Sequence, residues 1–268
     1  MSTDESMGHA EEVPHQNSKP SILLIVALVV ALASAGLSGY AISKATSGTP
    51  SESLAASVKD GDLYVAPVDL EGFIGTVEES VVEIFCYGTG TGFAYDLEVE
   101  DSEYKTVVVT NYHVVSDCLD DPSAMEIYTY DKYETPAKYR VRGVDEENDV
   151  ALLEIVEELP ILYGSEYFAK RGWWTMVIGN PVDTSFENEE DWRTLFNATT
   201  FGQISYVLDD YFNYTSATIN GGNSGGPLLN SRGEVIGINT EAAASTEFGV
   251  WNVAFDMAVL CKKLITCD

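Results

Sequence analysis

The sequence predicts an all-β domain over residues 68–268, preceded by a transmembrane helix. The domain consists of apolar runs of four to nine residues, rich in Val, Ile, Tyr and Phe, such as MEIYTYD, DVALLEIV and GQISYVL. Turn sequences such as SRGE and GNP separate these runs. Short strands divided by turn signals are typical of a β-sandwich or β-barrel rather than of βαβ units. Helical spacing is evident only in FDMAVLCKKLI, so we expect one short helix near the C-terminus.

Three segments precede the predicted domain. Residues 1–20 are polar, contain two prolines and have no apolar period, which predicts a disordered tail. Residues 21–42 carry no charge. At about 1.5 Å per residue they reach about 33 Å as a helix, enough to cross a bilayer core. Residues 43–67 are rich in Ser, Thr, Ala and Gly and are expected to be a linker.

The apolar segment has a second interpretation as a cleaved signal peptide. Ala33, Ser34 and Ala35 fit a small-x-small cleavage site, after which the protein would be secreted. The tail ahead of the segment is long and acidic, and the apolar stretch continues to Ile42, so a retained anchor is favoured. Lysines flank both ends and barely decide its orientation.

Composition excludes several function classes. The chain has 14 Lys and Arg against 43 Asp and Glu, a formal net charge of −29. Such a surface repels phosphate backbones, so we expect no nucleic-acid partner. With four cysteines, three histidines and no CxxC pair, a zinc site is improbable, and we expect neither metal nor cofactor.

The even cysteine count permits two disulfides if the domain lies outside the cytosol. Spacing does not determine the pairing. The favoured arrangement joins Cys86 to Cys118 and Cys261 to Cys267.

One serine stands among glycines in the run INGGNSGGPLL. Two glycines precede Ser224 and two follow it in the six-residue run 221–226. Glycine loses the most conformational entropy on folding, so it is costly in regular structure. Such a run indicates a backbone bent to present the hydroxyl. A serine hydroxyl needs a base to become a nucleophile, and His113 is the one histidine of the predicted domain.

A serine–histidine pair needs a third group that orients the imidazole. Asp149 stands directly before the apolar run VALLEI, at the expected mouth of a strand. The resulting chain order, His113, Asp149, Ser224, is that of the chymotrypsin class, and it differs from the order in α/β-hydrolases and subtilisins.

Three motifs together resemble a known family. TNYHVV, DVALLEI and GNSGGPLLN are similar to the histidine, aspartate and serine motifs of trypsin-like proteases, most closely those of the HtrA (Deg) branch. GTGTGF, VIGNP, and GEVIGINT followed by VAFDM resemble further segments of that branch in the same order. The resemblance covers roughly residues 74–265.

The resemblance implies a fold and a set of site residues. It implies two six-stranded β-barrels with the active site between them, the first carrying His113 and Asp149 and the second Ser224. Around Ser224, backbone N–H groups of the segment Gly222-Asn223-Ser224 would form the oxyanion hole. Thr218, Asn239 and Thr240 would lie against the substrate, Thr218 as the floor of the primary specificity pocket. Because threonine offers no carboxylate, we expect cleavage after small or medium uncharged side chains and not after Lys or Arg.

Three features depart from the resemblance. HtrA proteases usually carry a PDZ domain, whereas this chain ends soon after its protease-like part, so no PDZ domain is expected. Gly221 replaces a proline of the family, which favours a more mobile loop. Asn223 stands where trypsin zymogens have an activating aspartate, so we expect activity without N-terminal cleavage.

The sequence therefore predicts a single-pass membrane protein whose serine endopeptidase domain lies outside the cytoplasm. Its partners would be polypeptide substrates and the bilayer, and its role quality control or processing of proteins at the cell envelope. Two alternatives stay open: a binding or chaperone-like module without turnover, and a soluble secreted protease. Nothing in the sequence determines the oligomeric state.

Overall fold

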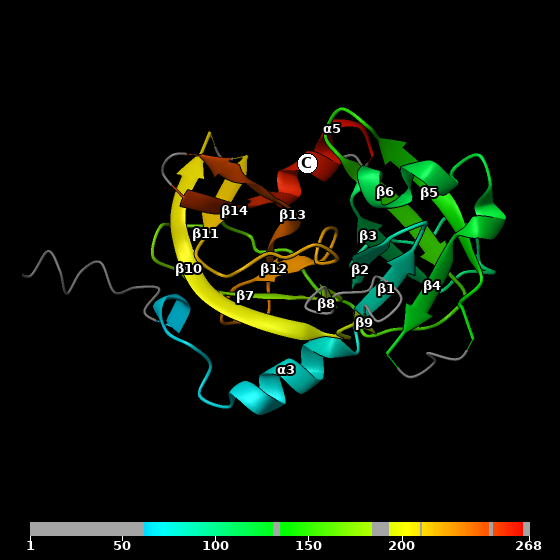
Figure 1. Ribbon diagram of the computed structural model, residues 1–268. Helices are drawn as coiled ribbons and strands as arrows, with labels where there is room; N and C mark the ends of the chain where they lie inside the picture. Colours follow the sequence, from blue (N-terminus) through cyan, green and yellow to red (C-terminus); the bar gives the residue numbers. More distant parts are fainter. Residues whose placement is uncertain (1–61, 131–134, 184–192, 210, 247–248, 265–268) are drawn as a thin grey trace, which may run out of the picture. The chain divides into compact units, whose positions relative to one another are not determined.

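The computed structural model describes residues 62–130, 135–183, 193–209, 211–246 and 249–264 (Figure 1). The predicted tail, the predicted transmembrane helix and Cys267 lie outside these residues. Among the described residues, no helix has the length and apolar character needed to cross a membrane. Strands dominate the described chain, which confirms the all-β prediction.

The first six strands form one antiparallel sheet in the order β4-β1-β2-β3-β6-β5. Its strands are β1 (Val81–Phe85), β2 (Thr89–Tyr95), β3 (Thr106–Thr110), β4 (Glu126–Thr129), β5 (Tyr139–Asp145) and β6 (Val150–Ile155). Every residue of β3 and β6 is buried, because both faces of this part of the sheet are covered. Consecutive valines and leucines in these strands fit a position without a solvated face.

The later strands form a closed barrel in the order β10-β11-β14-β13-β12-β7. They are β7 (Trp174–Gly179), β10 (Ala198–Leu208), β11 (Phe212–Thr215), β12 (Pro227–Leu229), β13 (Val235–Thr246) and β14 (Gly249–Phe255). A separate two-stranded hairpin joins β8 (Val182–Asp183) to β9 (Arg193–Thr194). In Figure 1 the barrel and the first sheet lie side by side, with β7 and β12 facing β1 and β2.

The expectation of two closed barrels is correct for one of them. The first sheet has six strands but does not close, because β4 and β5 stand at its edges without pairing to each other. Strand number follows from the sequence runs, whereas closure depends on how far the sheet coils, which no local pattern encodes.

The structure has a helix before the first strand, and the sequence analysis did not predict this helix. This helix, α3 (Leu70–Glu78), begins at Asp69, whose side chain accepts a hydrogen bond from the Gly72 amide. Its apolar residues Leu70, Phe73, Ile74 and Val77 pack on the core. Their spacing is helical, but Gly72 and Gly75 interrupt the pattern with poor helix formers.

The two sheets share one hydrophobic core. Side chains of β2 and β3 pack there against side chains of β7, β12 and β13; the buried members include Phe93, Val107, Val109, Met176, Ile178, Leu229 and Val235. The C-terminal segment, with α5 (Leu260–Lys263), adds Val259 and Leu260 to this core. The predicted short C-terminal helix is thus confirmed. A shared core fixes the position of one sheet relative to the other, and with it any site assembled from both.

Two further features stabilise the domain. The predicted Cys86–Cys118 disulfide is present in the first sheet, whereas the prediction for Cys261 involves a partner outside the described residues. Leu63, in the predicted linker, is 1% exposed and packs with Trp173 in the second barrel. The packed domain therefore includes residues that the composition assigns to the linker.

Candidate active site

Strand pairing brings His113 and Asp149 together. Strands β3 and β6 pair with Thr110 opposite Ala151. His113 follows the end of β3 on the short helix α4 (Tyr112–Val115), and Asp149 stands in the turn just before β6. Residues 36 positions apart in the chain therefore meet where the end of β3 lies beside the start of β6.

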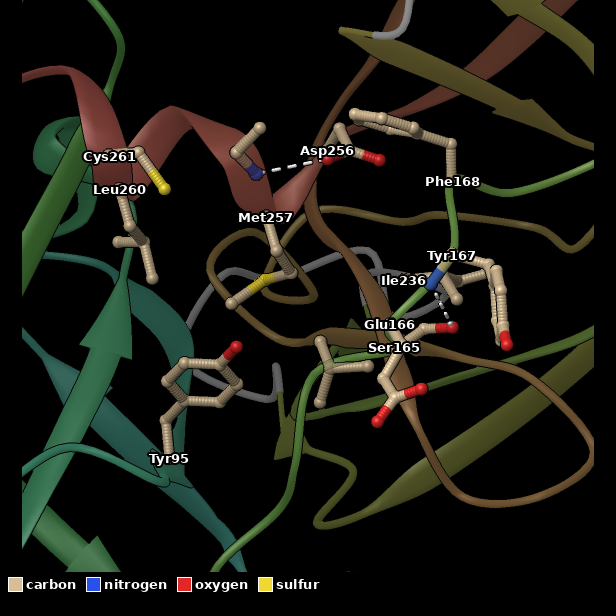
Figure 2. Close-up of a pocket in the computed structure, with 12 residues that line it drawn as sticks. Tyr95, Ser165, Glu166, Tyr167, Phe168, Ile236, Asp256, Met257, Leu260 and Cys261 are labelled. Atoms are coloured by element: carbon tan, nitrogen blue, oxygen red, sulfur yellow. Dashed lines mark hydrogen bonds between the residues drawn. The ribbon is translucent and has the colours of Figure 1, made fainter. Parts of the chain in front are cut away.

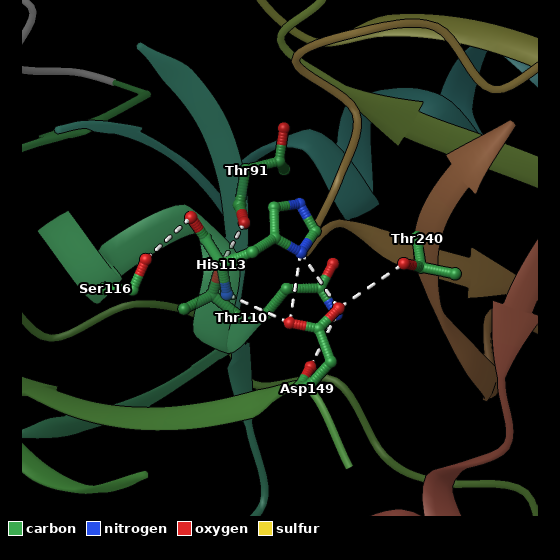
Figure 3. Close-up of polar contacts among 7 residues, drawn as sticks. Thr91, Thr110, His113, Ser116, Asp149 and Thr240 are labelled. Carbon is green, nitrogen blue, oxygen red and sulfur yellow. Dashed lines mark hydrogen bonds and ion pairs between the residues drawn. The ribbon is translucent and has the colours of Figure 1, made fainter. Parts of the chain in front are cut away.

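The imidazole and the carboxylate form a close pair, drawn in Figure 3. His113 Nδ1 lies 3.0 Å from Asp149 Oδ1 and 2.9 Å from Oδ2. The backbone N–H of His113 also donates to Oδ1 over 2.9 Å. An ionised carboxylate only accepts hydrogen bonds, so Nδ1 carries a proton and Nε2 is left as the basic nitrogen.

Asp149 is held by residues from both sheets. It adopts a left-handed conformation with φ of +50°, which aspartate tolerates better than most residues. The side-chain amide of Asn111 donates to its carbonyl over 2.8 Å. The hydroxyl of Thr240, on β13, donates to Oδ2 over 3.4 Å. Sequence reasoning placed Thr240 against the substrate; the structure places its hydroxyl on the carboxylate.

The turn that precedes Asp149 is stabilised by charge. Asp145 is buried and accepts hydrogen bonds from the backbone and side-chain amides of Asn148, and it forms an ion pair with Lys263 of α5 at 3.1 Å. Burial opposes ionisation of Asp145, but the hydrogen bonds from Asn148 and the Lys263 charge together lower the pKa of this carboxyl below its ordinary value. No sequence motif indicated this support.

Ser224 lies on the connection between β11 and β12. A turn from Asn220 to Asn223 precedes it, closed by the Asn223 N–H donating to the Asn220 carbonyl over 3.0 Å. Gly222 occupies the third position of this turn with φ of +96°, the conformation that a type II turn requires. A β-carbon at Gly222 would lie 2.3 Å from the Asn180 carbonyl oxygen, so no larger residue fits without rearrangement.

The serine loop packs directly on the first sheet. The Thr91 N–H donates to the Ser224 carbonyl over 2.9 Å. A β-carbon at Gly225 would lie 2.2 Å from both the Thr91 carbonyl oxygen and the Thr110 hydroxyl, and 3.0 Å from the Asn111 nitrogen. The residue after Ser224 therefore lies against the segment that leads into His113, and the glycines allow this close approach.

Two backbone donors of the serine loop belong to Gly222 and Ser224. Within the described part of the chain, the N–H groups of Gly222 and Ser224 make no hydrogen bond. The Val182 N–H holds the Gly221 carbonyl over 3.1 Å, so the Gly222 N–H of the same trans peptide points the opposite way. Paired N–H groups beside a serine are the arrangement that binds an oxyanion.

The other predicted substrate residues differ in exposure. Thr218 is exposed, and its carbonyl accepts a hydrogen bond from the Thr200 hydroxyl over 2.6 Å. Asn239 is fully buried. Its side-chain amide donates to the Pro227 carbonyl over 3.0 Å, and its carbonyl accepts from the Gly225 N–H over 2.8 Å. Asn239 therefore holds the serine loop.

A separate pocket of about 380 Å³ lies between Tyr95 of β2, the 165–168 segment and the 256–261 segment, as Figure 2 shows. Burial is the main cause that raises the pKa of Tyr95, followed by the charges of Asp96 and Asp256. Neither Ser224 nor His113 is among the residues that line it, so this pocket is separate from the candidate site. Within the described residues, no group of three or more His, Cys, Asp or Glu side chains is arranged to hold a metal.

Comparison with known proteins agrees with the geometry. Residues 90–238 match the trypsin-like peptidase domain family. A probable periplasmic serine endoprotease, DegP-like, from Chlamydia trachomatis is 35% identical over 178 residues, covering 66% of this chain and 32% of the relative. The putative serine protease HhoB of Synechocystis is 35% identical over 173 residues, covering 60% and 36%. The chain thus spans about a third of these relatives, and the predicted resemblance to the HtrA branch is confirmed.

Two solved protease structures share the fold of this chain. The serine endoprotease from Yersinia pestis matches with a TM-score of 0.55 and 25% identity over 74% of this chain and 66% of that one. The inactive Ser343Ala form of Rv3671c from Mycobacterium tuberculosis matches with a TM-score of 0.54 and 23% identity, covering 74% and 91%, which indicates a shared fold.

Proposed function

Since this chain belongs to the trypsin-like peptidase family, we propose that it is a serine endopeptidase with Ser224 as its nucleophile. The observation that carries the proposal is the His113–Asp149 pair at the end of β3 and the start of β6. The Ser224 loop packs on the same end of β3, the segment that leads to this pair, which supports a shared site. A binding module has no need of that arrangement.

The three side chains have distinct roles in the proposed reaction. The Ser224 hydroxyl attacks the scissile carbonyl while His113 Nε2 takes its proton and later returns it to the leaving amine. Asp149 keeps the proton on Nδ1 and stabilises the imidazolium that forms. Water then hydrolyses the acyl-enzyme by the same proton route in reverse.

The N–H groups of Gly222 and Ser224 form the oxyanion hole in this proposal, with Asn223 as the link between them. Neither donor has an acceptor among the residues that the structure describes, which supports this assignment. Preorganised donors stabilise the charge that develops on the carbonyl oxygen, and the loss of one costs about 2.7–4 kcal/mol of barrier in comparable sites.

Location and substrate belong to the same proposal. The apolar segment 21–42 anchors the protein, and the catalytic domain lies outside the cytoplasm, where it acts on envelope polypeptides for quality control or processing. The Cys86–Cys118 disulfide supports an oxidising compartment. An exposed threonine at position 218 supports a preference for uncharged side chains. Membrane fractionation with N-terminal sequencing separates the anchored form from one cut after Ala35.

The direct test is digestion of casein by the full chain in detergent beside its Ser224→Ala variant. We expect cleavage and labelling by a fluorophosphonate probe in the unaltered protein, and neither in Ser224→Ala. Ser205→Ala, which removes an exposed hydroxyl of β10, is the matched control and should retain both. A folded protein that neither cleaves nor takes the label would instead be a silent member of the family.

A further inference from the structure

We infer that Thr91 is a positioning residue that fixes both oxyanion donors of the serine loop. This inference rests on the proposed function. Thr91 is fully buried in the middle of β2, on the first sheet, and lies against the loop of the second barrel. Its hydroxyl donates to the Gly222 carbonyl over 2.6 Å, and its N–H donates to the Ser224 carbonyl over 2.9 Å.

The direction of the hydroxyl contact follows from its neighbours. The Asn180 N–H donates to Thr91 Oγ1 over 3.0 Å, so this oxygen acts there as an acceptor. A hydroxyl has one proton, and the Gly222 carbonyl can only accept. The Thr91 proton therefore points to Gly222, and one side chain joins the β7 end to the serine loop.

The backbone of the loop depends on external support because glycine has the widest conformational freedom. The Val182 N–H holds the carbonyl before Gly222, and the Thr91 hydroxyl holds the carbonyl of Gly222 itself. The direction of the Gly222 N–H is thus fixed from both sides. The Thr91 N–H holds the carbonyl of Ser224 itself. The Gly226 N–H holds the carbonyl before Ser224 over 3.0 Å, so the peptides on both sides of Ser224 are held as well.

Thr91 is itself held in place by the first sheet. Its carbonyl accepts a hydrogen bond from the Thr110 hydroxyl over 2.7 Å, and Thr110 is the residue that ends β3 before the His113 helix. Thr91 therefore links the base-bearing segment to the oxyanion donors. The sequence placed Thr91 in the GTGTGF motif without a role, since the motif lies far from Ser224 in the chain.

The test compares three variants of the full chain by steady-state kinetics on a peptide substrate. Thr91→Val keeps the shape and removes the proton donor, so a buried carbonyl loses its partner, and kcat should fall about tenfold or more with little change in KM. Thr91→Ser keeps the donor and should restore most of kcat. Thr175→Val, which removes a buried hydroxyl paired with Thr215 inside the second barrel, should leave kcat close to that of the unaltered protein.

Two further readouts separate positioning from a general loss of packing. Affinity for a peptide aldehyde, whose hemiacetal oxygen occupies the oxyanion site, should fall in Thr91→Val by the same factor as kcat/KM. Hydrogen exchange of the 220–226 peptide should be faster in Thr91→Val than in Thr91→Ser or Thr175→Val, and this measurement needs no turnover.

An unchanged kcat in Thr91→Val, an equal loss in Thr91→Ser, or unchanged exchange of the 220–226 peptide would overturn the inference. Absence of cleavage and of fluorophosphonate labelling in the unaltered protein would overturn the proposed function instead. The exchange comparison still decides the positioning of the loop in that case.

Discussion

The two halves of the candidate site are supported in different ways. On the first sheet, His113 and Asp149 are held by hydrogen bonds to the Asp149 carboxylate, from the His113 ring, the His113 backbone N–H and the Thr240 hydroxyl. On the second barrel, Ser224 is held through its backbone, by carbonyls that accept hydrogen bonds and by glycines in close contact. His113 is thus oriented by hydrogen bonds that a substitution can remove. The Ser224 loop depends instead on close backbone contacts at glycines, which an added β-carbon would disrupt.

This difference determines which substitutions are informative in each half. A conservative exchange of functional groups tests the first half, because the contacts there are made by side chains. The addition of a single β-carbon tests the second half. Solvent exposure follows the same division: the His113 side chain is 43% exposed, whereas Ser224 is 9% exposed.

The largest effect is expected for Asp149→Asn. The amide presents a donor where the carboxylate accepted, so Nδ1 loses its proton and Nε2 is no longer basic. We expect kcat to fall about 10⁴-fold, as in other triads of this type. Asparagine tolerates the left-handed conformation at this position, so the melting temperature should change little. Steady-state kinetics and thermal unfolding measure the two quantities.

If Asp149→Asn retains more than a tenth of the kcat of the unaltered protein, the Asp149 carboxylate does not orient His113 as described. Thr240→Val is the companion variant, because it removes only the second-barrel hydrogen bond to the same carboxylate. Its loss should be far smaller than that of Asp149→Asn.

Gly222→Ala should have the next largest effect. The new β-carbon would lie 2.3 Å from the Asn180 carbonyl oxygen in a conformation with φ of +96°, so the turn must change and the Gly222 N–H moves with it. Since one oxyanion donor is lost, we expect kcat to fall about 10²- to 10³-fold. Kinetics on the same peptide substrate measure the loss.

Gly75→Ala is the matched control for this glycine. A β-carbon at Gly75 of α3 would have no atom within 4 Å, and its φ is not in the left-handed region. We expect full activity and a gain in stability of about 0.5–1 kcal/mol, because alanine favours the helix. An equally large loss of kcat in Gly75→Ala would show that the protein is sensitive to glycine replacement in general, and the loss in Gly222→Ala would then say nothing specific about the oxyanion donor.

The smallest effect concerns Glu83 of β1, a buried carboxylate in the first sheet. Burial is the main cause that raises the pKa of Glu83, and a hydrogen bond with Thr194 opposes it. The folded state therefore holds this proton to higher pH than the unfolded state. The resulting stability is complete below the ordinary glutamate pKa and is lost as the pH rises through the folded pKa.

Glu83→Gln should accordingly raise the melting temperature by a few degrees at pH 7 and make no difference in mildly acidic buffer below the ordinary glutamate pKa. Its kcat should change little, because Glu83 pairs with Thr91 through the backbone of β1 and β2, which the substitution leaves in place. Thermal unfolding across this pH range measures the effect. A melting temperature that falls at pH 7 would mean that the Thr194 hydrogen bond outweighs burial.

The sequence predicted the strand-rich fold well where the pattern is local. Short apolar runs and turn residues identified the all-β class, and FDMAVLCKKLI identified the C-terminal helix. It did not reveal α3, where two glycines interrupt an apolar face, or the open edge between β4 and β5. Closure of a sheet is a property of its overall coil, so no single segment encodes it.

For the site, chemistry identified the central residues and geometry identified their supports. His113 and Asp149 were predicted as partners, and His113 Nδ1 lies 2.9 Å from Asp149 Oδ2. The roles of Thr91, Asn111 and the Asp145–Lys263 pair were not foreseen, because ordinary polar residues acquire them only through contacts between distant segments. Asn239 is buried and its side-chain amide and carbonyl hold the serine loop, while its predicted contact with the substrate stays a prediction.

The distribution of these groups over two lobes has a consequence for biosynthesis. The ribosome delivers β1–β6, with His113 and Asp149, well before the last barrel strand that follows Ser224 has emerged. Folding begins with the N-terminal part of a nascent chain. In the proposed function, the Ser224 hydroxyl meets His113 only after the later barrel has closed and docked. The nascent polypeptide would then be harmless to its neighbours, and the onset of proteolysis would report that the last lobe has matured.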